Sequence, residues 1–267
     1  YFSGLNIYSD RHYFNHKNDE KLSKLYLVLG EAIRDFINPD RVIIGTNSKK
    51  ANKIMNTLYA PIVKKTSRYY STSRRGAELI KYASNAFLAT KITYINELAN
   101  LCEKTGVDIK DISVGMGSDE RIGGRFLRAG PAYGGSCFPK DTRALINTAN
   151  QFKTDLSIIK SVIKSNNNRK ILLTKRLENI LNNRLKNKVI TFLGVTFKPN
   201  TDDMREASSI PMIKYLNKKN SKIRYHDPSG EKNEFKKLKN VKYYKDIPSA
   251  CLNSDLIVLH TEWNDFR

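Results

Sequence analysis

The pattern of apolar and polar positions predicts short strands and helices from about residue 40 onward. The run RVIIG at residues 41–45 is short and β-branched and follows Pro39 and Asp40, so it predicts a buried strand. Residues 49–59 then predict a helix, which we expect to end before Pro61.

A long helix is predicted from about residue 73 to 105. Its apolar residues recur at helical spacing, and Gly106 follows as a residue that suits a helix C-terminus. The recurring positions are Leu79, Ile80, Ala83, Phe87, Leu88, Ile92, Ile95, Leu98 and Leu101. Within this helix Lys81 and Asn85 are four residues apart, so both project from one face. By themselves they are typical of an exposed pair on a surface helix.

The second half of the chain changes from helices to alternating strands and helices. Further helices are predicted at residues 110–114, 140–149 and 156–181. From about Lys188 onward, strands are predicted at 188–197, 222–226 and 256–260, with helices at 208–216, 230–238 and 247–253. This alternation favours parallel βα units. We therefore expect an α/β protein in which a long helix joins an N-terminal domain to a helical middle and a C-terminal α/β domain.

The charge balance is strongly basic, with 47 Lys plus Arg against 26 Asp plus Glu and a formal net charge of +21. The lysines are dispersed among asparagines, without the arginine-rich arm or the aromatic-basic alternation of nucleic-acid modules. This dispersal argues against specific nucleic-acid binding and fits solvated faces with a basic pocket for a phosphorylated substrate.

Cysteine, histidine and apolar content narrow the class of protein further. The 3 cysteines and 4 histidines show no metal-ligand or disulfide spacing. No apolar run reaches the length of a membrane span, and the N-terminus lacks a signal-peptide pattern. We expect a cytoplasmic protein with no metal and no membrane association.

The most informative stretch is AGPAYGGSCFPKDTRAL, residues 129–145. Gly134 and Gly135 allow a tight turn, and Pro139 suits the first position of a helix. Cys137 would then lie just before a helix N-terminus, where backbone N–H groups and the helix dipole favour a thiolate. Asp141 follows one turn later, within reach of base chemistry. The alternative is a glycine turn beside a small buried cysteine.

Six segments together resemble the UDP-glucose 6-dehydrogenases of the nucleotide-sugar dehydrogenase family. They are GEAIRDFINPDRVIIG (30–45), AELIKYASNAFLATKITYINELANLCE (77–103), DERIGGRFLRAGPAYGGSCFPKDTRAL (119–145), GVTFKPNTDDMREASS (194–209), YHDP (225–228) and TEWNDF (261–266). The resemblance implies a remnant of an N-terminal Rossmann-like NAD domain at residues 1–72. It further implies a central helical dimerisation and catalytic domain at 73–186 and a C-terminal Rossmann-like UDP-sugar domain at 187–267. GDP-mannose dehydrogenases carry a similar cysteine motif and stay the nearest competing branch.

The resemblance implies oxidation of a sugar C6 alcohol to a carboxylate in two NAD-dependent hydride transfers. Cys137 matches the nucleophile that forms a thiohemiacetal and then a thioester. Lys81 and Asn85 match the pair that stabilises the oxyanion at C6, and Asp141 matches the residue that helps to activate water.

The resemblance also implies binding roles and a partner. Lys140 and Arg205 match NAD contacts, and Arg121 matches a residue that reaches the substrate of an adjoining subunit, so a homodimer or a higher homo-oligomer is implied. UDP-glucose is the implied substrate. Its remaining contacts match Phe126, Leu127, Arg128, Ala129, Gly130, Gly134 and Lys198.

The sequence departs from the family pattern near its N-terminus. No G-x-G-x-x-G follows an N-terminal strand, and the two glutamates of the family's N-P-E-F-L-x-E-G segment fall on Leu25 and Leu29. Loss of such a carboxylate predicts thioester hydrolysis slower by on the order of 10² to 10⁴. The onset of the resemblance at residue 30 is abrupt, which predicts a reading-frame change or a truncated gene.

Two further readings of the sequence stay open beside the active enzyme. One is a catalytically silent chain that keeps the helical dimer core and binds sugar nucleotide weakly. The other is a basic nucleic-acid-binding protein, which the motif residues disfavour.

Overall fold

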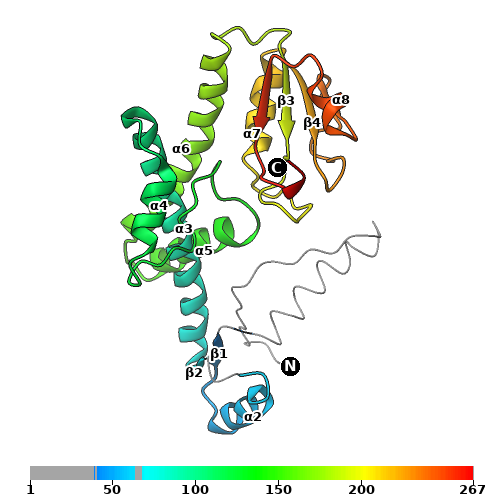
Figure 1. Cartoon of the computed structure of the whole chain (residues 1–267). Coiled ribbons are helices and arrows are strands. Elements are labelled where there is room, and N and C mark those ends of the chain that lie inside the picture. Colours follow the sequence, from blue (N-terminus) through cyan, green and yellow to red (C-terminus); the bar gives the residue numbers. More distant parts are fainter. Residues whose placement is uncertain (1–38, 40, 64–67, 267) are drawn as a thin grey trace. The chain divides into compact units, whose positions relative to one another are not determined.

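The structure is a computed structural model that describes residue 39 and residues 41–63 and 68–266. The chain divides into two units, residues 1–84 and residues 85–267, and each is described by itself. Figure 1 shows the elements along the chain. Leu25 and Leu29, and with them the expectations for the N-terminal segment, lie outside the described residues.

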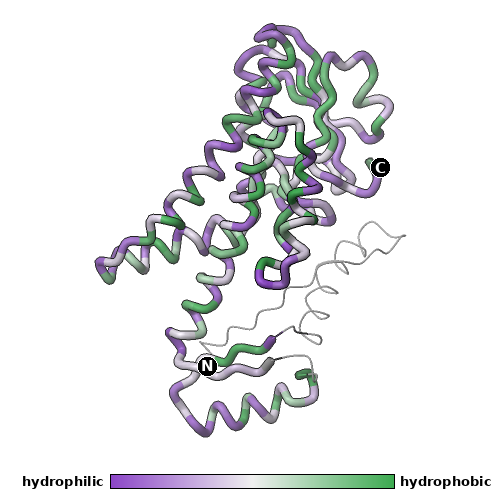
Figure 2. Tube along the Cα trace, turned by 60° about the vertical axis from the view of Figure 1, so that its left-hand side comes forward, coloured by the Kyte–Doolittle hydropathy of each residue, from purple (hydrophilic) through white to green (hydrophobic). Residues whose placement is uncertain are grey.

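The first unit contains a pair of parallel strands and one helix. Strand β1 (Arg41–Gly45) pairs with β2 (Arg68–Thr72), and helix α2 (Lys49–Tyr59) connects toward it. Val42 and Ile44 of β1 pack against Met55 and Tyr59 of α2. The predicted strand and helix are confirmed. Strand β2 was not predicted because its sequence RYYST lacks apolar alternation, and Figure 2 shows it paler than the strongly apolar β1 beside it.

Helix α3 (Arg74–Thr105) confirms the predicted long helix and runs from the first unit into the second. Gly106 follows it with φ +74°, a left-handed conformation that glycine adopts at low cost. The side of α3 that is buried carries mostly small residues, among them Ala86, Ala89, Ala99 and Cys102. Of the apolar residues that predicted the helix, Ile95 is fully buried, whereas Leu79, Phe87 and Leu101 are exposed.

Three more helices follow α3 in the second unit: α4 (Ile109–Gly117), α5 (Cys137–Gln151) and α6 (Ser157–Ile180). All three were predicted, but α5 begins at Cys137 rather than at Lys140. Pro139 is therefore the third helical residue and not the first. The proline is tolerated there because the first four N–H groups of a helix have no partner within the helix.

The C-terminal part of the second unit is a four-stranded parallel sheet of order β5-β4-β3-β6. Its strands are β3 (Val189–Leu193), β4 (Lys222–His226), β5 (Val241–Tyr243) and β6 (Leu256–Leu259), and its helices are α7 (Ser209–Lys218), α8 (Ile247–Cys251) and the short η1 (Asn264–Phe266). The expected parallel βα arrangement and the α/β fold class are confirmed.

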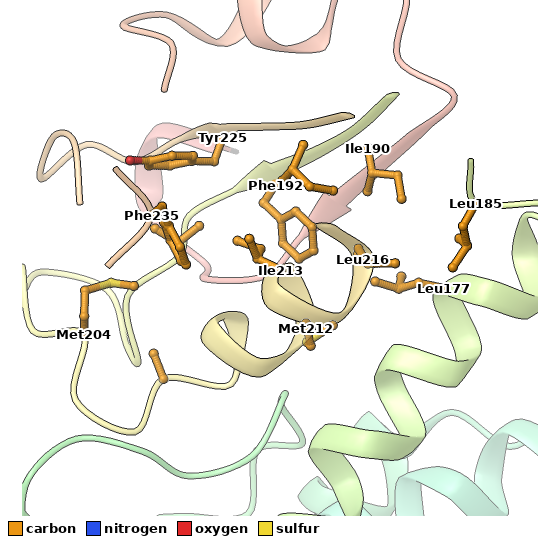
Figure 3. Packing of buried hydrophobic residues seen from close by; sticks show 13 residues of the cluster. Leu177, Leu185, Ile190, Phe192, Met204, Met212, Ile213, Leu216, Tyr225 and Phe235 are labelled. Atoms are coloured by element: carbon orange, nitrogen blue, oxygen red, sulfur yellow. The ribbon is translucent and has the colours of Figure 1, made fainter. Parts of the chain in front are cut away.

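The core of this sheet lies between β3, β4 and the helix α7. Phe192 of β3 and Ile213 and Leu216 of α7 are completely buried, and Figure 3 shows them together with Leu177 from the end of α6. Full burial of side chains of this size stabilises the fold by about 2 kcal/mol each. The core therefore joins the sheet to the last turns of α6.

Two predictions in this part were wrong. Residues 230–238 form turns and not a helix: Gly230 has φ +90°, and the backbone N–H of Lys232 donates to the hydroxyl of Tyr225 instead of to a helical carbonyl. Strand β5 was missed because it has only 3 residues, too few for a periodic pattern.

Candidate active site

Cys137 is the first residue of α5 and is exposed. This contradicts the alternative of a small buried cysteine. The Oγ of the preceding Ser136 lies 3.8 Å from the Cys137 Sγ. The thiol thus lies at a helix N-terminus, where unpartnered N–H groups and the helix dipole favour negative charge.

The glycine turn before Cys137 is pressed against the loop that follows β3. A Cβ on Gly134 would lie 2.7 Å from the backbone oxygen of Glu206, and one on Gly135 would lie 2.8 Å from the ring of Phe197. Gly135 also has φ +76°, and its N–H donates to the carbonyl of Arg205 over 2.8 Å. Only glycine allows this close approach and this backbone conformation.

Asp141 lies one turn after Cys137 and is completely buried. The amide nitrogen of Asn85 donates to its Oδ2 over 2.5 Å, and the Lys140 ammonium forms an ion pair with its Oδ1. These two donors compensate for burial of the carboxylate. The structure therefore brings together three predicted site residues from two helices that are 56 positions apart in sequence at the Asn85–Asp141 contact.

Lys81 lies on α3, four residues before Asn85, and belongs to the first unit. It shares a helix face with Asn85, as the spacing predicts. Its role at the oxyanion stays a prediction.

The predicted cations Arg205 and Lys198 both lie on the loop between β3 and α7. Arg205 forms a forked contact with Asp203, at 2.9 Å from Nε and 2.8 Å from an Nη, and this hydrogen bonding raises the pKa of Arg205. Cys137 adds a smaller electrostatic contribution in the same direction, so the guanidinium lies within its electrostatic reach. The Nζ of Lys198 lies 5.6 Å above the ring of Phe197, the same ring that meets Gly135.

Residues 126–130 form a loop that contacts α5 and the chain near residue 262. The ring of Phe126 packs edge-on against Phe138 with centroids 6.1 Å apart. Leu127 is buried, Ala129 is half-buried, and Arg128 forms an exposed ion pair with Glu262. The predicted substrate loop thus lies beside the first turn of α5.

Arg121 is not among the residues that surround Cys137. Its side chain is 89% exposed and forms a forked contact with Asp119. The neighbouring carbonyls of Ile122 and Gly123 each accept a 2.9 Å hydrogen bond from Lys91 of α3, whose pKa is lowered by burial. Lys91 thereby holds the segment that presents Arg121 to solvent.

Several residues that organise this site were not predicted, among them Asn96, Asn166, Arg169 and Glu206. They lie on α3, on α6 and in the loop before α7, outside the cysteine motif. No local pattern distinguishes them from solvated polar residues, because their partners are 30 or more positions away in sequence.

Metal and membrane features are quickly described. Within residues 41–63 and 68–266, no group of three or more His, Cys, Asp or Glu side chains could hold a metal ion. In that same part of the chain, no helix has the length and apolar character needed to cross a bilayer.

Two family descriptions match the chain in order. The central domain of the UDP-glucose/GDP-mannose dehydrogenase family matches residues 75–168, and the UDP binding domain of the same family matches residues 191–267. The chain belongs to this family. The central-domain match contains the Asn85, Cys137 and Asp141 group, and the UDP-binding match contains the loop with Lys198 and Arg205.

Curated relatives and solved structures agree with this assignment. The chain is 45% identical over 244 residues to the UDP-glucose 6-dehydrogenase of Rickettsia typhi, which covers 91% of this chain and 56% of the relative. It is 45% identical to UDP-glucose 6-dehydrogenase YwqF of Bacillus subtilis, over 91% of this chain and 54% of that protein. The structure of a UDP-glucose dehydrogenase from Pyrobaculum islandicum superposes with a TM-score of 0.82 at 33% identity, covering 88% of this chain and 54% of that one. The chain therefore spans about half the length of the relatives it matches.

Proposed function

We propose that this chain carries the cysteine chemistry of a UDP-glucose 6-dehydrogenase, which oxidises UDP-glucose to UDP-glucuronate with NAD. The observation that carries the proposal is the position of Cys137: an exposed thiol as the first residue of α5, one turn before the buried Asp141. The similarity to UDP-glucose 6-dehydrogenases supports the substrate.

In the proposed reaction the C6 alcohol loses a hydride and a proton and becomes an aldehyde. The Cys137 thiolate adds to the aldehyde carbon, and the oxygen is protonated to a thiohemiacetal. Loss of a second hydride and of the hydroxyl proton gives a thioester, which one water hydrolyses to the carboxylate and the free thiol. Lys81 and Asn85 stabilise the oxyanion at C6, and Asp141 helps to activate the water.

NAD, when bound, supplies the hydride acceptor for both oxidations. Lys140 and Arg205 are exposed cations on either side of Cys137 in the sequence, and Arg205 lies within electrostatic reach of the thiol, so their charge fits an anionic dinucleotide. Among the described residues no strand leads into a G-x-G-x-x-G turn and a helix. Lys140 and Arg205 therefore contribute charge to the dinucleotide, and no further step is assigned through it.

The substrate would lie along the loop of residues 126–130 and the glycine turn, with Gly134 leaving space beside Cys137. Lys198 and Arg128 add positive charge near this path, which suits a pyrophosphate. Leu127 and Phe126 anchor the loop by packing, and Ala129 and Gly130 would offer backbone groups to the nucleotide sugar.

A homodimer is the proposed assembly, in the cytoplasm. Phe87, Tyr94 and Leu101 of α3 are spaced by seven residues, so they share one helix face, and they are 64%, 49% and 57% exposed. Arg121 would reach the substrate of the second copy from its exposed position. Light scattering should find a dimer for the natural chain and a monomer for Tyr94→Glu.

The substrate assignment is tested by protection of Cys137 from iodoacetamide. Peptide mass spectrometry resolves Cys137 from Cys251, which serves as an internal control. UDP-glucose should slow alkylation of Cys137 alone, and Lys198→Ala should weaken this protection by roughly tenfold in concentration. Equal protection by GDP-mannose would move the proposal to the GDP-mannose branch, and no protection by either would contradict it.

The activity is tested by absorbance at 340 nm with UDP-glucose and NAD. Turnover should disappear in Cys137→Ser and persist in Cys251→Ser. Mass spectrometry of quenched mixtures should detect a sugar thioester on Cys137 if the leucines at positions 25 and 29 slow hydrolysis. Turnover that survives Cys137→Ser would remove the cysteine from the mechanism.

A further inference from the structure

Asn166 of α6 binds both backbone groups of Tyr133. Its Oδ1 accepts a hydrogen bond from the Tyr133 N–H over 2.9 Å, and its Nδ2 donates to the Tyr133 carbonyl over 3.1 Å. The side chain of Asn166 is buried, with the residue 4% exposed. A side-chain amide in this position replaces the partner that a neighbouring strand would give to an extended segment.

Gly130, three residues earlier, is held in the same way by two side chains. Its N–H donates to Oδ1 of the buried Asn96 over 2.8 Å, and its carbonyl accepts from Nε of Arg169 over 2.8 Å. Arg169 is itself fixed, because one Nη donates to the carbonyl of Asn96 and to Oδ1 of Asn100 over 2.9 and 2.6 Å. Burial lowers the pKa of Arg169.

The segment between these anchors has an unfavourable backbone. Ala132 has φ +123°, a conformation that residues with a Cβ rarely adopt. Such a conformation persists only where surrounding contacts determine it more strongly than the local preference opposes it. The side chains on α3 and α6 supply these contacts, and five of the hydrogen bonds named above lie within 2.6–2.9 Å.

This segment connects the two parts of the candidate site. Gly130 ends the loop of residues 126–130, and Tyr133 directly precedes the glycine turn that leads to Cys137. The ring of Tyr133 packs edge-on against Phe138 in the first turn of α5, with centroids 6.0 Å apart. Displacement at residues 130–133 would therefore move both the substrate loop and the start of α5.

We propose that Asn166, Asn96 and Arg169 are positioning residues that fix the segment 130–133 and thereby set the place of Cys137 relative to the substrate loop. The catalytic relevance rests on the proposed function, whereas the coupling to Cys137 does not. None of the three needs to touch the substrate for this role. They act through the backbone of Gly130 and Tyr133.

The three cysteines give one experiment with separate readouts. Cys137 reports the site, the buried Cys102 reports unfolding of α3, and Cys251 reports the sheet. In Asn166→Ala, we expect iodoacetamide to label Cys137 about threefold more slowly at neutral pH, because the thiol no longer keeps its place at the helix N-terminus. Labelling of Cys102 and Cys251 should stay as in the natural chain.

Hydrogen exchange provides the second readout. The N–H of Gly135, which donates to Arg205 and not to Asn166, should exchange about tenfold faster in Asn166→Ala. The matched control is Asn168→Ala, which removes an exposed amide from the same helix and should change neither readout.

Two outcomes would overturn the proposal: unchanged Cys137 labelling and Gly135 exchange, or labelling of Cys102 along with Cys137, which would assign Asn166 to general stability. If Asn166→Ala does not fold, Arg169→Lys provides the same test, since a lysine cannot hold the carbonyls of Gly130 and Asn96 together. Altered Cys137 labelling without any UDP-glucose protection in the natural chain would support the positioning role and contradict the proposed function.

Discussion

The side-chain amide of Asn85 donates a 2.5 Å hydrogen bond to the completely buried carboxylate of Asp141. This contact joins the middle of α3 to the first turn of α5. It couples a residue proposed for the oxyanion to one proposed for water activation, so a change in either residue affects the other.

The first prediction concerns this pair. Asn85→Ala leaves Oδ2 of Asp141 without its amide donor in a buried position, so the free energy of unfolding should fall by about 2 kcal/mol. Urea denaturation measures the change. Asn150→Ala removes an exposed amide from α5 and should have little effect. A loss of equal size in both variants would show that the Asn85 contact has no special weight.

The second prediction concerns the glycine turn. Gly135→Ala places a Cβ 2.8 Å from the Phe197 ring at φ +76°, so we expect destabilisation of about 2 kcal/mol. Gly130→Ala is the control, because a Cβ there meets no atom within 4 Å. Thermal denaturation of the two variants should separate them clearly. Comparable melting temperatures would contradict the close packing of the turn against Phe197.

The third prediction is a pH dependence that originates in His260. Burial lowers the pKa of His260 to about 4, and its ring nitrogens lie 2.8 Å from Ser208 Oγ and 2.9 Å from Thr261 Oγ1. The unfolded chain takes up a proton near pH 6.5 and the folded chain only near pH 4. Stability from this residue is therefore complete above pH 6.5 and is lost as the pH falls from 6.5 to 4, by about 3 kcal/mol in total.

Urea midpoints at pH 7.5 and pH 5 measure this dependence. His260→Gln should reduce the difference between the two midpoints, although the variant is less stable at pH 7.5. His226→Gln, at a half-buried histidine, is the control and should leave the difference in place. An undiminished difference in His260→Gln would assign the pH dependence to other groups.

The fourth prediction contrasts two ion pairs. Lys232 pairs with Asp227 at 3.6 Å, and their side chains are 5% and 0% exposed, whereas Arg128 and Glu262 pair at 66% and 43% exposure. Lys232→Ala should lower the free energy of unfolding by about 3 kcal/mol, because a buried carboxylate loses its cation. Arg128→Ala should change it by less than about 0.5 kcal/mol. Chemical denaturation compares them, and similar losses would contradict the role of burial.

Local sequence was sufficient for most helices and for strands with continuous apolar runs. The stretch RVIIG predicted β1 because β-branched residues favour extended backbone, and the periodicity of residues 73–105 predicted α3. Strand β2 and the turns at 230–238 were not predicted correctly, because pairing with β1 and the contact between Lys232 and Tyr225 override weak local preferences.

The cysteine motif by itself determined that Cys137 would follow a glycine turn at the beginning of a helix, since glycine, proline and helix-forming residues act over a few positions. Only the tertiary structure decided which side chains surround that turn. Asn85 meets Asp141 across 56 positions, and Asn166 meets Tyr133 across 33. Such contacts depend on how helices pack, and polar residues that meet a distant partner look the same in sequence as those that face solvent.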